Sequence, residues 1–394
     1  MTLKNILTII LFVFCFNSYS QETNIASNKK QQSILNKIDS IQNTKSETDK
    51  TTQFKLGEFY YDLFANEFDW YGGNDFDKVK AKNWFEKSII LLEKSAKQGF
   101  SEAYLSLGKI YENTPDYNGD IYNYNDTNKA IYWFKKLLEQ RTYEYPGYIM
   151  HELGLIYKTG HRGDTNLKDD KIAIKWFEKA ASNGRIESMK KLGDMYYYGN
   201  GVSEDDEKAF YWYKKCVEES DFTIYNNDLA VMYYYGTGTT KSIKKAYDLF
   251  KESAEKSGYK IGNTNRHHSN ATACYYIGIM YYLGEHLEKN YDKSFWWIET
   301  AAMNGDIDAS SLLGYMYYYG QGTLVDKQLA FTWLKYSEKN KDNYSQYLLG
   351  TMYYYGEVTT VDYKKSAYYM KKAFENGSKE AKEFWDKKEL WKYK

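Results

Sequence analysis

The residues of this chain that could hold a metal ion gather in one short stretch, "RHHSNATAC", which contains His267, His268 and Cys274. Imidazole and thiolate groups are preferred zinc ligands, but a zinc site needs three or four of them in tetrahedral geometry. Three ligands at this spacing match poorly, and His286 lies about 20 Å away, beyond an intervening helix with a rise of 1.5 Å per residue. We interpret the stretch as a solvated loop, so the sequence predicts no bound metal and no cofactor.

Motifs of the commonest enzymes are absent from the chain. It contains no G-x-S-x-G turn for a nucleophilic serine, no phosphate-binding P-loop, no G-x-G-x-x-G and no H-E-x-x-H. The sequence therefore favours a protein that is not an enzyme, with a hydrolase kept as an alternative.

Polar residues recur at a fixed place in a longer pattern. Each stands four residues before a small residue. Three residues after that small residue comes an aromatic residue or a leucine. Every one can accept hydrogen bonds from the free N–H groups that open a helix. We predict that they are helix N-caps: Asp77, Asp126, Asp169, Asp205, Ser242, Asn290, Asp326 and Asp362.

A second recurring frame precedes each of these caps. It reads glycine, any residue, an aliphatic residue and tyrosine, and a degenerate copy surrounds Gly57. The clear copies begin at Gly108, Gly154, Gly193, Ala230, Gly278, Gly314 and Gly350. One unit is thus a helix, a glycine-containing turn and a capped helix, and about eight stacked units predict an all-α solenoid.

The best-defined unit resembles the Sel-1-like repeat, a relative of the tetratricopeptide repeat. It reads Leu192-Gly193-x-Met195-Tyr196-x-x-Gly199-x-Gly201-Val202, then Asp205-x-x-Lys208-Ala209-x-x-Trp212-Tyr213-x-Lys215. The resemblance covers residues 51–377. It implies a right-handed α/α superhelix that serves as an adaptor or scaffold, and it implies no catalysis. Ala230 in place of glycine and Leu249 in place of tryptophan put the local helix spacing in doubt, but not the fold.

Three consecutive tyrosine positions end the first helix of each later unit. The first of them, the inner column, shares a helix face with residues such as Leu192, because residues four apart lie within about 40° of each other. We therefore predict that the inner column is core: Tyr111, Tyr157, Tyr196, Tyr233, Tyr281, Tyr317 and Tyr353.

The next two positions, the middle and outer columns, point roughly 120–140° away from that face. Two interpretations fit them. In the related tetratricopeptide repeats, the matching positions line a concave groove that holds extended peptides, which makes these tyrosines a candidate binding site. Alternatively, they pack against the next repeat. The candidates are Tyr197, Tyr198, Tyr234, Tyr235, Tyr282, Tyr318, Tyr319, Tyr354 and Tyr355, with Leu283 in the one outer position that lacks tyrosine.

The two ends of the chain differ from the repeats. Residues 1–20 have an early lysine, an apolar run of about 11 residues and small residues near Ser20, which is typical of a signal peptide cleaved after that serine. An uncleaved membrane anchor is the alternative, but it requires roughly 20 apolar residues. We expect a polar linker at 21–50 with at most a short helix, and a capping helix at 378–394. Export, to the periplasm or cell surface, permits a disulfide between Cys216 and Cys274, while the two helices between them favour free buried thiols.

Charge limits the choice of partner. The 53 basic and 53 acidic residues balance to a net charge of zero, so the 394-residue chain has no footprint for nucleic acid or for an anionic membrane. We predict an exported scaffold that binds another protein or an extended peptide. A glycan-binding protein of the cell envelope remains the alternative, because sugars also stack on aromatic rings.

Overall fold

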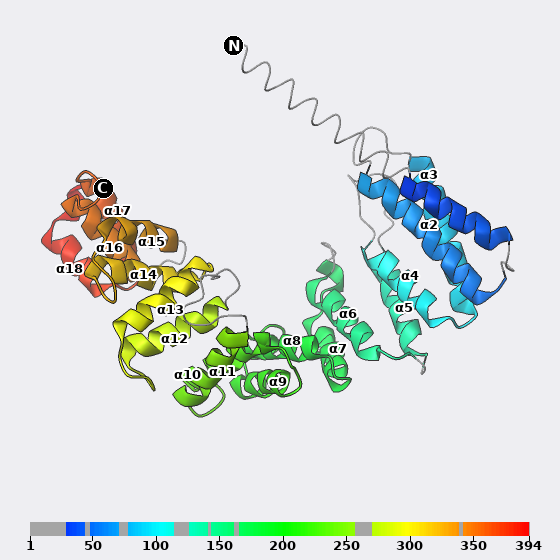
Figure 1. The fold of residues 1–394 in the computed structure, drawn as a ribbon, viewed down its shortest axis with the longest axis horizontal. Helices are drawn as coiled ribbons and strands as arrows, with labels where there is room; N and C mark the ends of the chain where they lie inside the picture. The colour runs from blue at the N-terminus through cyan, green and yellow to red at the C-terminus, as the bar shows by residue number, and fades with distance from the viewer. Residues whose placement is uncertain are drawn as a thin grey trace, which may run out of the picture. The chain divides into compact units, whose positions relative to one another are not determined.

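Every regular element that the computed structural model describes is a helix (Figure 1). The described residues are 29–43, 48–70, 78–113, 126–140, 143–160, 165–256, 270–338 and 342–393. The predicted signal peptide lies outside them, as do Asp77, His267 and His268. The all-α prediction is confirmed for these ranges.

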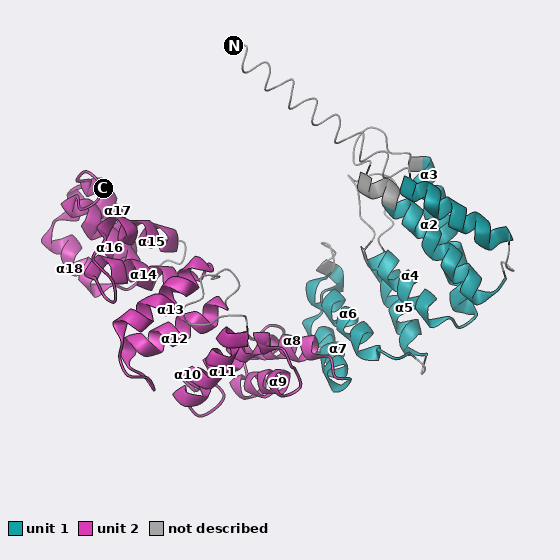
Figure 2. Ribbon diagram, in the orientation of Figure 1, with its two compact units in different colours: residues 1–183 teal, residues 184–394 magenta. Residues whose placement is uncertain are grey.

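The chain divides into two compact units, which Figure 2 colours separately. Unit 1, residues 1–183, holds a helix at residues 29–43 and three helix pairs. The pairs consist of α2 (Lys50–Trp70) with α3 (Lys78–Lys97), α4 (Ser101–Asn113) with α5 (Thr127–Leu138), and α6 (Pro146–Thr159) with α7 (Asp170–Ser182).

Unit 2, residues 184–394, holds five further pairs and a terminal helix. Its pairs are α8 (Ile186–Tyr197) with α9 (Asp206–Glu218), α10 (Asn226–Tyr235) with α11 (Ile243–Lys256), α12 (Ala271–Leu283) with α13 (Tyr291–Met303), α14 (Ile307–Tyr319) with α15 (Lys327–Ser337), and α16 (Asn343–Tyr355) with α17 (Tyr363–Glu375). The predicted solenoid of eight helix-turn-helix repeats is therefore confirmed.

The glycine frame sets how closely the two helices of a pair approach. A Cβ atom placed on Gly193 would lie 2.5 Å from the ring of Tyr213 on the second helix of the same pair. Only a residue without a side chain fits this contact. Ala230, which replaces the frame glycine in the fifth repeat, is buried. Phe250 lies 20 residues after Ala230, as Tyr213 lies 20 after Gly193, and its ring stacks on Tyr276 of the next repeat with centroids 4.7 Å apart.

The N-cap prediction is confirmed at six of the eight positions. The carboxylate or amide oxygen accepts the backbone N–H three residues later at 2.9–3.0 Å at Asp126, Asp169, Asp205, Asn290, Asp326 and Asp362. At Ser242 the corresponding distance is 3.5 Å, which is too long for a strong bond. Each cap thus starts the second helix of its repeat.

The inner column is less buried than predicted. Only Tyr111 and Tyr353 are buried, while the other five tyrosines are half-buried. The core position is the aliphatic residue just before each of them, which is at most 3% exposed: Ile110, Ile156, Met195, Met232, Met280, Met316 and Met352. This residue faces the second helix, whereas the inner tyrosine lies at the edge of the core. There a lysine of the next helix covers its ring, as Lys208 covers Tyr196.

The segment 21–50 that we expected to be a linker contains a packed helix. Residues 29–43 are helical, and the buried side chains of Ile34 and Ile38 contact Leu56, Tyr60 and Leu63 on α2. We expected a linker with at most a short helix here; residues 29–43 form a helix packed on α2, because two isoleucines four residues apart make one apolar stripe.

The C-terminal helix covers the last repeat but is shorter than the predicted 378–394. Helix α18 (Lys379–Lys387) begins after the cap Ser378 and buries Trp385 against α17. It ends because Glu389 adopts a left-handed backbone conformation with φ of 52°, and a short 3₁₀ turn, Leu390–Tyr393, follows.

Cys216 and Cys274 are both buried and are not joined in a disulfide, which agrees with the interpretation of two structural thiols. Burial raises the pKa of the Cys216 thiol to about 12. In the ranges described above, no helix is both long enough and apolar enough to cross a bilayer.

Candidate functional site

The middle column of tyrosines connects each repeat to the next. The hydroxyls of Tyr234, Tyr282 and Tyr318 donate to an acidic or amide side chain in the turn that ends the first helix of the following repeat. The donor and acceptor pairs are Tyr234 and Glu285 at 2.7 Å, Tyr282 and Gln321 at 2.8 Å, and Tyr318 and Glu357 at 3.2 Å. Burial, first, and then these hydrogen-bonding groups raise the pKa of Tyr234 and of Tyr318. The middle column is therefore part of the junction between repeats.

The two remaining members of the middle column are placed similarly. Tyr354 packs edge-on against Phe384 of α18, with ring centroids 5.2 Å apart, where a further repeat would otherwise lie. Tyr197 is half-buried, and burial raises its pKa. Four of the five middle rings thus contact the following repeat or the terminal helix, as the packing interpretation expects: Tyr234, Tyr282, Tyr318 and Tyr354.

The outer column behaves differently, although its sequence is almost the same. Its exposed fractions run from 47% at Tyr319 to 63% at Tyr198, and the substituted position, Leu283, is 54% exposed. Each outer ring rests on the middle ring beside it, as Tyr235 does on Tyr234 at 5.0 Å between centroids. The outer column thus presents five apolar or aromatic side chains to solvent: Tyr198, Tyr235, Leu283, Tyr319 and Tyr355.

A cavity of about 400 Å³ opens between the first helices of the sixth, seventh and eighth repeats, α12, α14 and α16. Tyr319 borders it, because its ring contacts that of Tyr315 at 4.6 Å and its hydroxyl lies 3.5 Å from the hydroxyl of Tyr344. The cavity is lined by Tyr275, Ile279, Tyr282, Asp308, Ser311, Leu312, Tyr315, Asp342 and Tyr344. Only Tyr282 among the sequence candidates lines it directly.

The sequence contained a signal for the missed lining residues. Tyr315 stands four positions before Tyr319, and Tyr275 stands eight before Leu283. Residues spaced by four and eight share one helix face. The outer column and these tyrosines consequently belong to one surface, which extends along the first helices.

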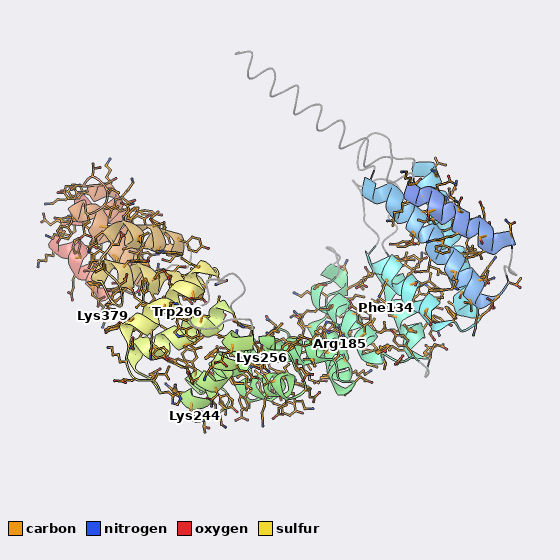
Figure 3. All side chains as sticks on the ribbon, viewed as in Figure 1. Phe134, Arg185, Lys244, Lys256, Trp296 and Lys379 are labelled. Atoms are coloured by element: carbon orange, nitrogen blue, oxygen red, sulfur yellow. The ribbon has the colours of Figure 1, made fainter. Side chains whose placement is uncertain are left out.

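From α10 to α17, basic residues within the repeat helices are confined to the second helix of each pair. Helices α10, α12, α14 and α16 contain two aspartates, Asp228 and Asp308, and no lysine, arginine or histidine. The second helices α11, α13, α15 and α17 all contain lysine; Lys244 and Lys256 of α11 are labelled in Figure 3. The cavity therefore combines tyrosine with carboxylate, although the whole chain is electrically neutral.

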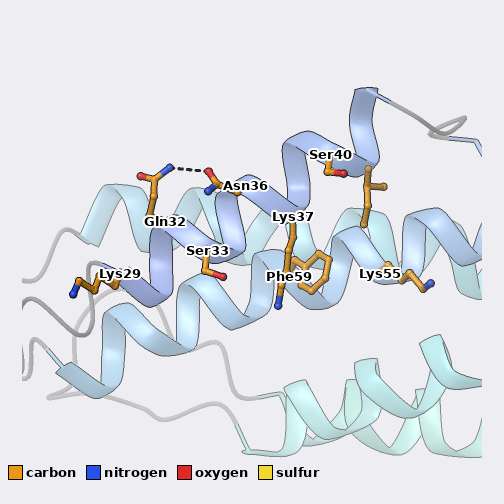
Figure 4. A pocket seen from close by; sticks show the side chains of 9 residues that line it. Lys29, Gln32, Ser33, Asn36, Lys37, Ser40, Lys55 and Phe59 are labelled. Atoms are coloured by element: carbon orange, nitrogen blue, oxygen red, sulfur yellow. Dashed lines mark hydrogen bonds between the residues drawn. The ribbon is translucent and has the colours of Figure 1, made fainter.

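Another cavity, of about 800 Å³, lies in unit 1 between the helix at 29–43 and α2 (Figure 4). Its lining is polar and basic, with Lys29, Lys37 and Lys55 and a 3.0 Å hydrogen bond from Gln32 to Asn36. The three lysines are all exposed and come from the surface of two helices, so they do not provide the fixed, buried polar groups of a specific anion site.

In the described ranges, no group of three or more histidine, cysteine or acidic residues could hold a metal ion. Of the zinc candidates raised from sequence, Cys274 is buried inside its repeat. His286 lies beside the ring of Tyr247, at 5.3 Å between centroids.

Eight helical hairpins with a shared glycine, cap and tyrosine frame define a helical-repeat solenoid protein. The model of the Sel1 repeat matches well over half of the chain, at residues 77–100, 101–141, 149–184, 186–219, 225–257, 271–306, 307–341 and 343–378. The chain belongs to the Sel1 repeat family, whose fold is typically a non-catalytic scaffold for protein interaction.

Similar proteins agree on the fold. A crystal structure of a Sel1 repeat protein from Oxalobacter formigenes superimposes with a TM-score of 0.60 and 24% identity, covering 90% of both chains. An uncharacterised Sel1-like repeat-containing protein of Schizosaccharomyces pombe is 45% identical over 13% of this chain. An uncharacterised protein of Neisseria meningitidis serogroup B is 26% identical over 35% of it. The matches span only 8% and 26% of those two relatives.

Proposed function

We propose that this protein is a non-catalytic scaffold that binds another protein, through an extended segment, along the outer column of unit 2. The observation that carries this proposal is the different use of two neighbouring tyrosine columns. Three middle hydroxyls donate hydrogen bonds to the next repeat, whereas the outer side chains remain exposed in five successive repeats. Tyrosine supplies a rigid apolar area with a polar tip at a low entropic cost, which suits a recognition surface.

The regular spacing of the outer column distinguishes it from other exposed tyrosines. Several second helices also carry a tyrosine that is about half exposed: Tyr132, Tyr211, Tyr336 and Tyr368. The first, second and fourth of these share one position of the repeat, but they lie in the second, fourth and eighth repeats, which are not successive. These four second-helix tyrosines provide a matched control, because they have the same residue type as the four outer tyrosines and a similar exposure.

The test is a selection of binders from a displayed library of random 12-residue peptides, with the full chain as bait. The affinity of the selected peptides is then measured for two fourfold variants. One replaces Tyr198, Tyr235, Tyr319 and Tyr355 with alanine, and the other replaces the four second-helix tyrosines. We expect the first variant to lose more than about tenfold in affinity and the control to lose little, since truncated aromatic contacts dominate such interfaces.

Both variants must keep the helical circular dichroism and the melting temperature of the unchanged chain. If the outer variant unfolds, the outer rings are structural and the proposed site is wrong. If it stays folded and binds peptide as before, binding lies elsewhere. Tyrosine-dependent binding to purified peptidoglycan, without any peptide binding, would instead favour the glycan-binding alternative.

We further propose that the protein acts outside the cytoplasm, in the periplasm or at the cell surface. The support is the sequence of residues 1–20, with its lysine, apolar run and small residues near Ser20. Amino-terminal sequencing of the protein recovered from its native cells should begin at Gln21. An intact Met1 on the mature protein would contradict this.

A further inference from the structure

We propose that the cavity between α12, α14 and α16 receives the cationic side chain of a lysine or arginine from the bound segment. This inference rests on the proposed function and specifies which chemistry the scaffold recognises. It makes the cavity the place where specificity is set, while the outer column supplies contact area along the segment.

The first support is the composition of the cavity wall. The rings of Tyr275, Tyr282, Tyr315 and Tyr344 line it together with the exposed carboxylate of Asp308. A cation within about 6 Å of a tyrosine ring is attracted by the negative face of the ring, and a carboxylate adds a direct ion pair. Its volume of about 400 Å³ falls within the range of about 300–1,000 Å³ that is usual for ligand pockets.

The second support is the distribution of charge. The three helices that form the cavity contain no lysine, arginine or histidine, although the chain has 53 basic residues. Two acidic residues, Asp308 and the α16 cap Asp342, line the cavity, and Asp342 also accepts a 2.6 Å hydrogen bond from the Ser311 hydroxyl. These helices therefore present a surface of negative sign, which attracts a cationic group and disfavours an anionic one.

The third support is that carboxylates of two successive first helices already hold a lysine of this chain two repeats earlier. On α8, Lys190 pairs with Asp194, lies 3.3 Å from the Asp228 carboxylate of α10 and is 5.2 Å from the centre of the Tyr213 ring. Lys190 stands three residues before the frame glycine of α8. At that position α12 and α14 have Tyr275 and Ser311, and both line the cavity.

Lys190 therefore shows which groups surround a cation in this fold. Carboxylates of two successive first helices and a tyrosine ring surround one ammonium group. At α12 and α14 the lysine is replaced by the neutral residues Tyr275 and Ser311, and both of these line the cavity. A basic side chain from the bound segment would meet the same kinds of group at the cavity, carboxylate oxygens and tyrosine rings, although from other positions of the repeat.

The experiment uses the peptide selection described above, now scored for composition. Peptides selected by the unchanged chain should be enriched in lysine or arginine at one position relative to the input library. Replacing that residue with citrulline, which keeps the shape of arginine but has no charge, should weaken binding about tenfold. Binding should also weaken as salt is raised, because the ion pair is screened.

Asp308→Asn is the matching change in the protein, and we expect it to reduce affinity about fivefold. Asp292→Asn is its control, since Asp292 is also an exposed aspartate at the second position of a helix but lies on α13. We expect the control to bind as the unchanged chain does. A Tyr315→Leu variant, which keeps an apolar side chain without the ring, should weaken arginine peptides more than citrulline peptides.

The outcomes separate the inference from the proposed function. Selected peptides that depend on the outer column, but show no basic enrichment or bind Asp308→Asn as tightly as the unchanged chain, overturn the cationic pocket and leave the scaffold proposal standing. A selection that yields no binding peptide overturns both. Enrichment that disappears in Asp308→Asn and persists in Asp292→Asn supports the pocket.

Discussion

The hydroxyl of Tyr282 donates a 2.8 Å hydrogen bond to the side-chain oxygen of Gln321, 39 residues further along the chain. Gln321 directly follows the glycine that ends α14, so this bond connects the first helix of one repeat to the turn of the next. Tyr318 and Glu357 make the same connection, again 39 residues apart. Some tyrosines that the sequence offered as a binding site, Tyr282 and Tyr318, thus connect successive repeats.

Replacing Tyr282 with phenylalanine should lower the free energy of unfolding by about 1 kcal/mol, because it removes one hydrogen bond and leaves the Gln321 oxygen without this donor. Chemical denaturation followed by circular dichroism measures the difference. Tyr198→Phe is the control: its side chain is 63% exposed, and such surface changes stay within about 0.5 kcal/mol. Equal effects of the two changes would show that the middle hydroxyls add nothing to the junction.

Replacing Gly193 with alanine should destabilise the protein by about 1–3 kcal/mol, because an added methyl group in a filled contact forces neighbouring atoms to move. The neighbour here is the ring of Tyr213, which also donates a 2.8 Å hydrogen bond to Asp194 and is therefore held in place. Lys191→Ala, an exposed change on the same helix, should have little effect. A fully tolerated Gly193→Ala would mean that the two helices can separate at no cost.

Replacing Lys190 with methionine should cost about 1 kcal/mol at neutral pH, a modest value because Lys190, Asp194 and Asp228 are each about one-third exposed. Burial raises the pKa of Asp228, while Lys190 lowers it. Without the lysine, the folded-state pKa of Asp228 lies still further above its unfolded value, so its charge disfavours folding wherever it is ionised.

The deficit of Lys190→Met should therefore be largest at pH 7 and should shrink as the pH falls through the raised folded-state pKa of Asp228. Urea unfolding at pH 7 and pH 4 provides the comparison. The same substitution made in an Asp228→Asn background should lose most of this pH dependence. A deficit that grows on acidification would contradict the assigned pairing.

Tyr111 predicts a loss of stability at alkaline pH. Burial, first, and the negative charges of Glu93 and Asp126 raise its pKa from 10.0 to about 12. Between those values the unfolded chain releases the tyrosine proton before the folded chain does, so stability that is complete below pH 10 is lost up to about pH 12. Tyr111→Phe should reduce this loss by about 1.4 kcal/mol at pH 11, since one pKa unit is worth about that much. Denaturant unfolding at pH 8, 10 and 11 tests the prediction, and identical pH profiles for the two proteins would refute it.

The fold could be predicted because its signals are local. A cap such as Asp205 and a glycine such as Gly193 act within one helical hairpin, and the stacking of hairpins follows from their apolar faces. For residues 21–50 we expected at most a short helix, and the packing of the helix at 29–43 on α2 was not predicted, since its apolar stripe consists of few residues, Ile34 and Ile38 among them, in a polar segment. The segment is polar in composition, but the four-residue spacing of Ile34 and Ile38 places both on one face of a helix.

The candidate site was harder to predict because it depends on neighbouring repeats. Middle and outer tyrosines differ by one position and by about 100° around the helix, and only the turn of the following repeat decides which of them is covered. The acceptors Glu285, Gln321 and Glu357 all directly follow a turn glycine, a regularity that was present in the sequence. The cavity required three helices at once and could not be derived from any single unit.

The tyrosine-to-turn connection has a consequence for how such a chain can change in evolution. It uses one donor and one acceptor that the sixth and seventh repeats both carry, and the pairs Tyr282 with Gln321 and Tyr318 with Glu357 have the same offset. A duplicated repeat brings its own donor for the unit after it and its own acceptor for the unit before it. The array can consequently lengthen or shorten by whole units through gene duplication or deletion, without any compensating substitution at the junction.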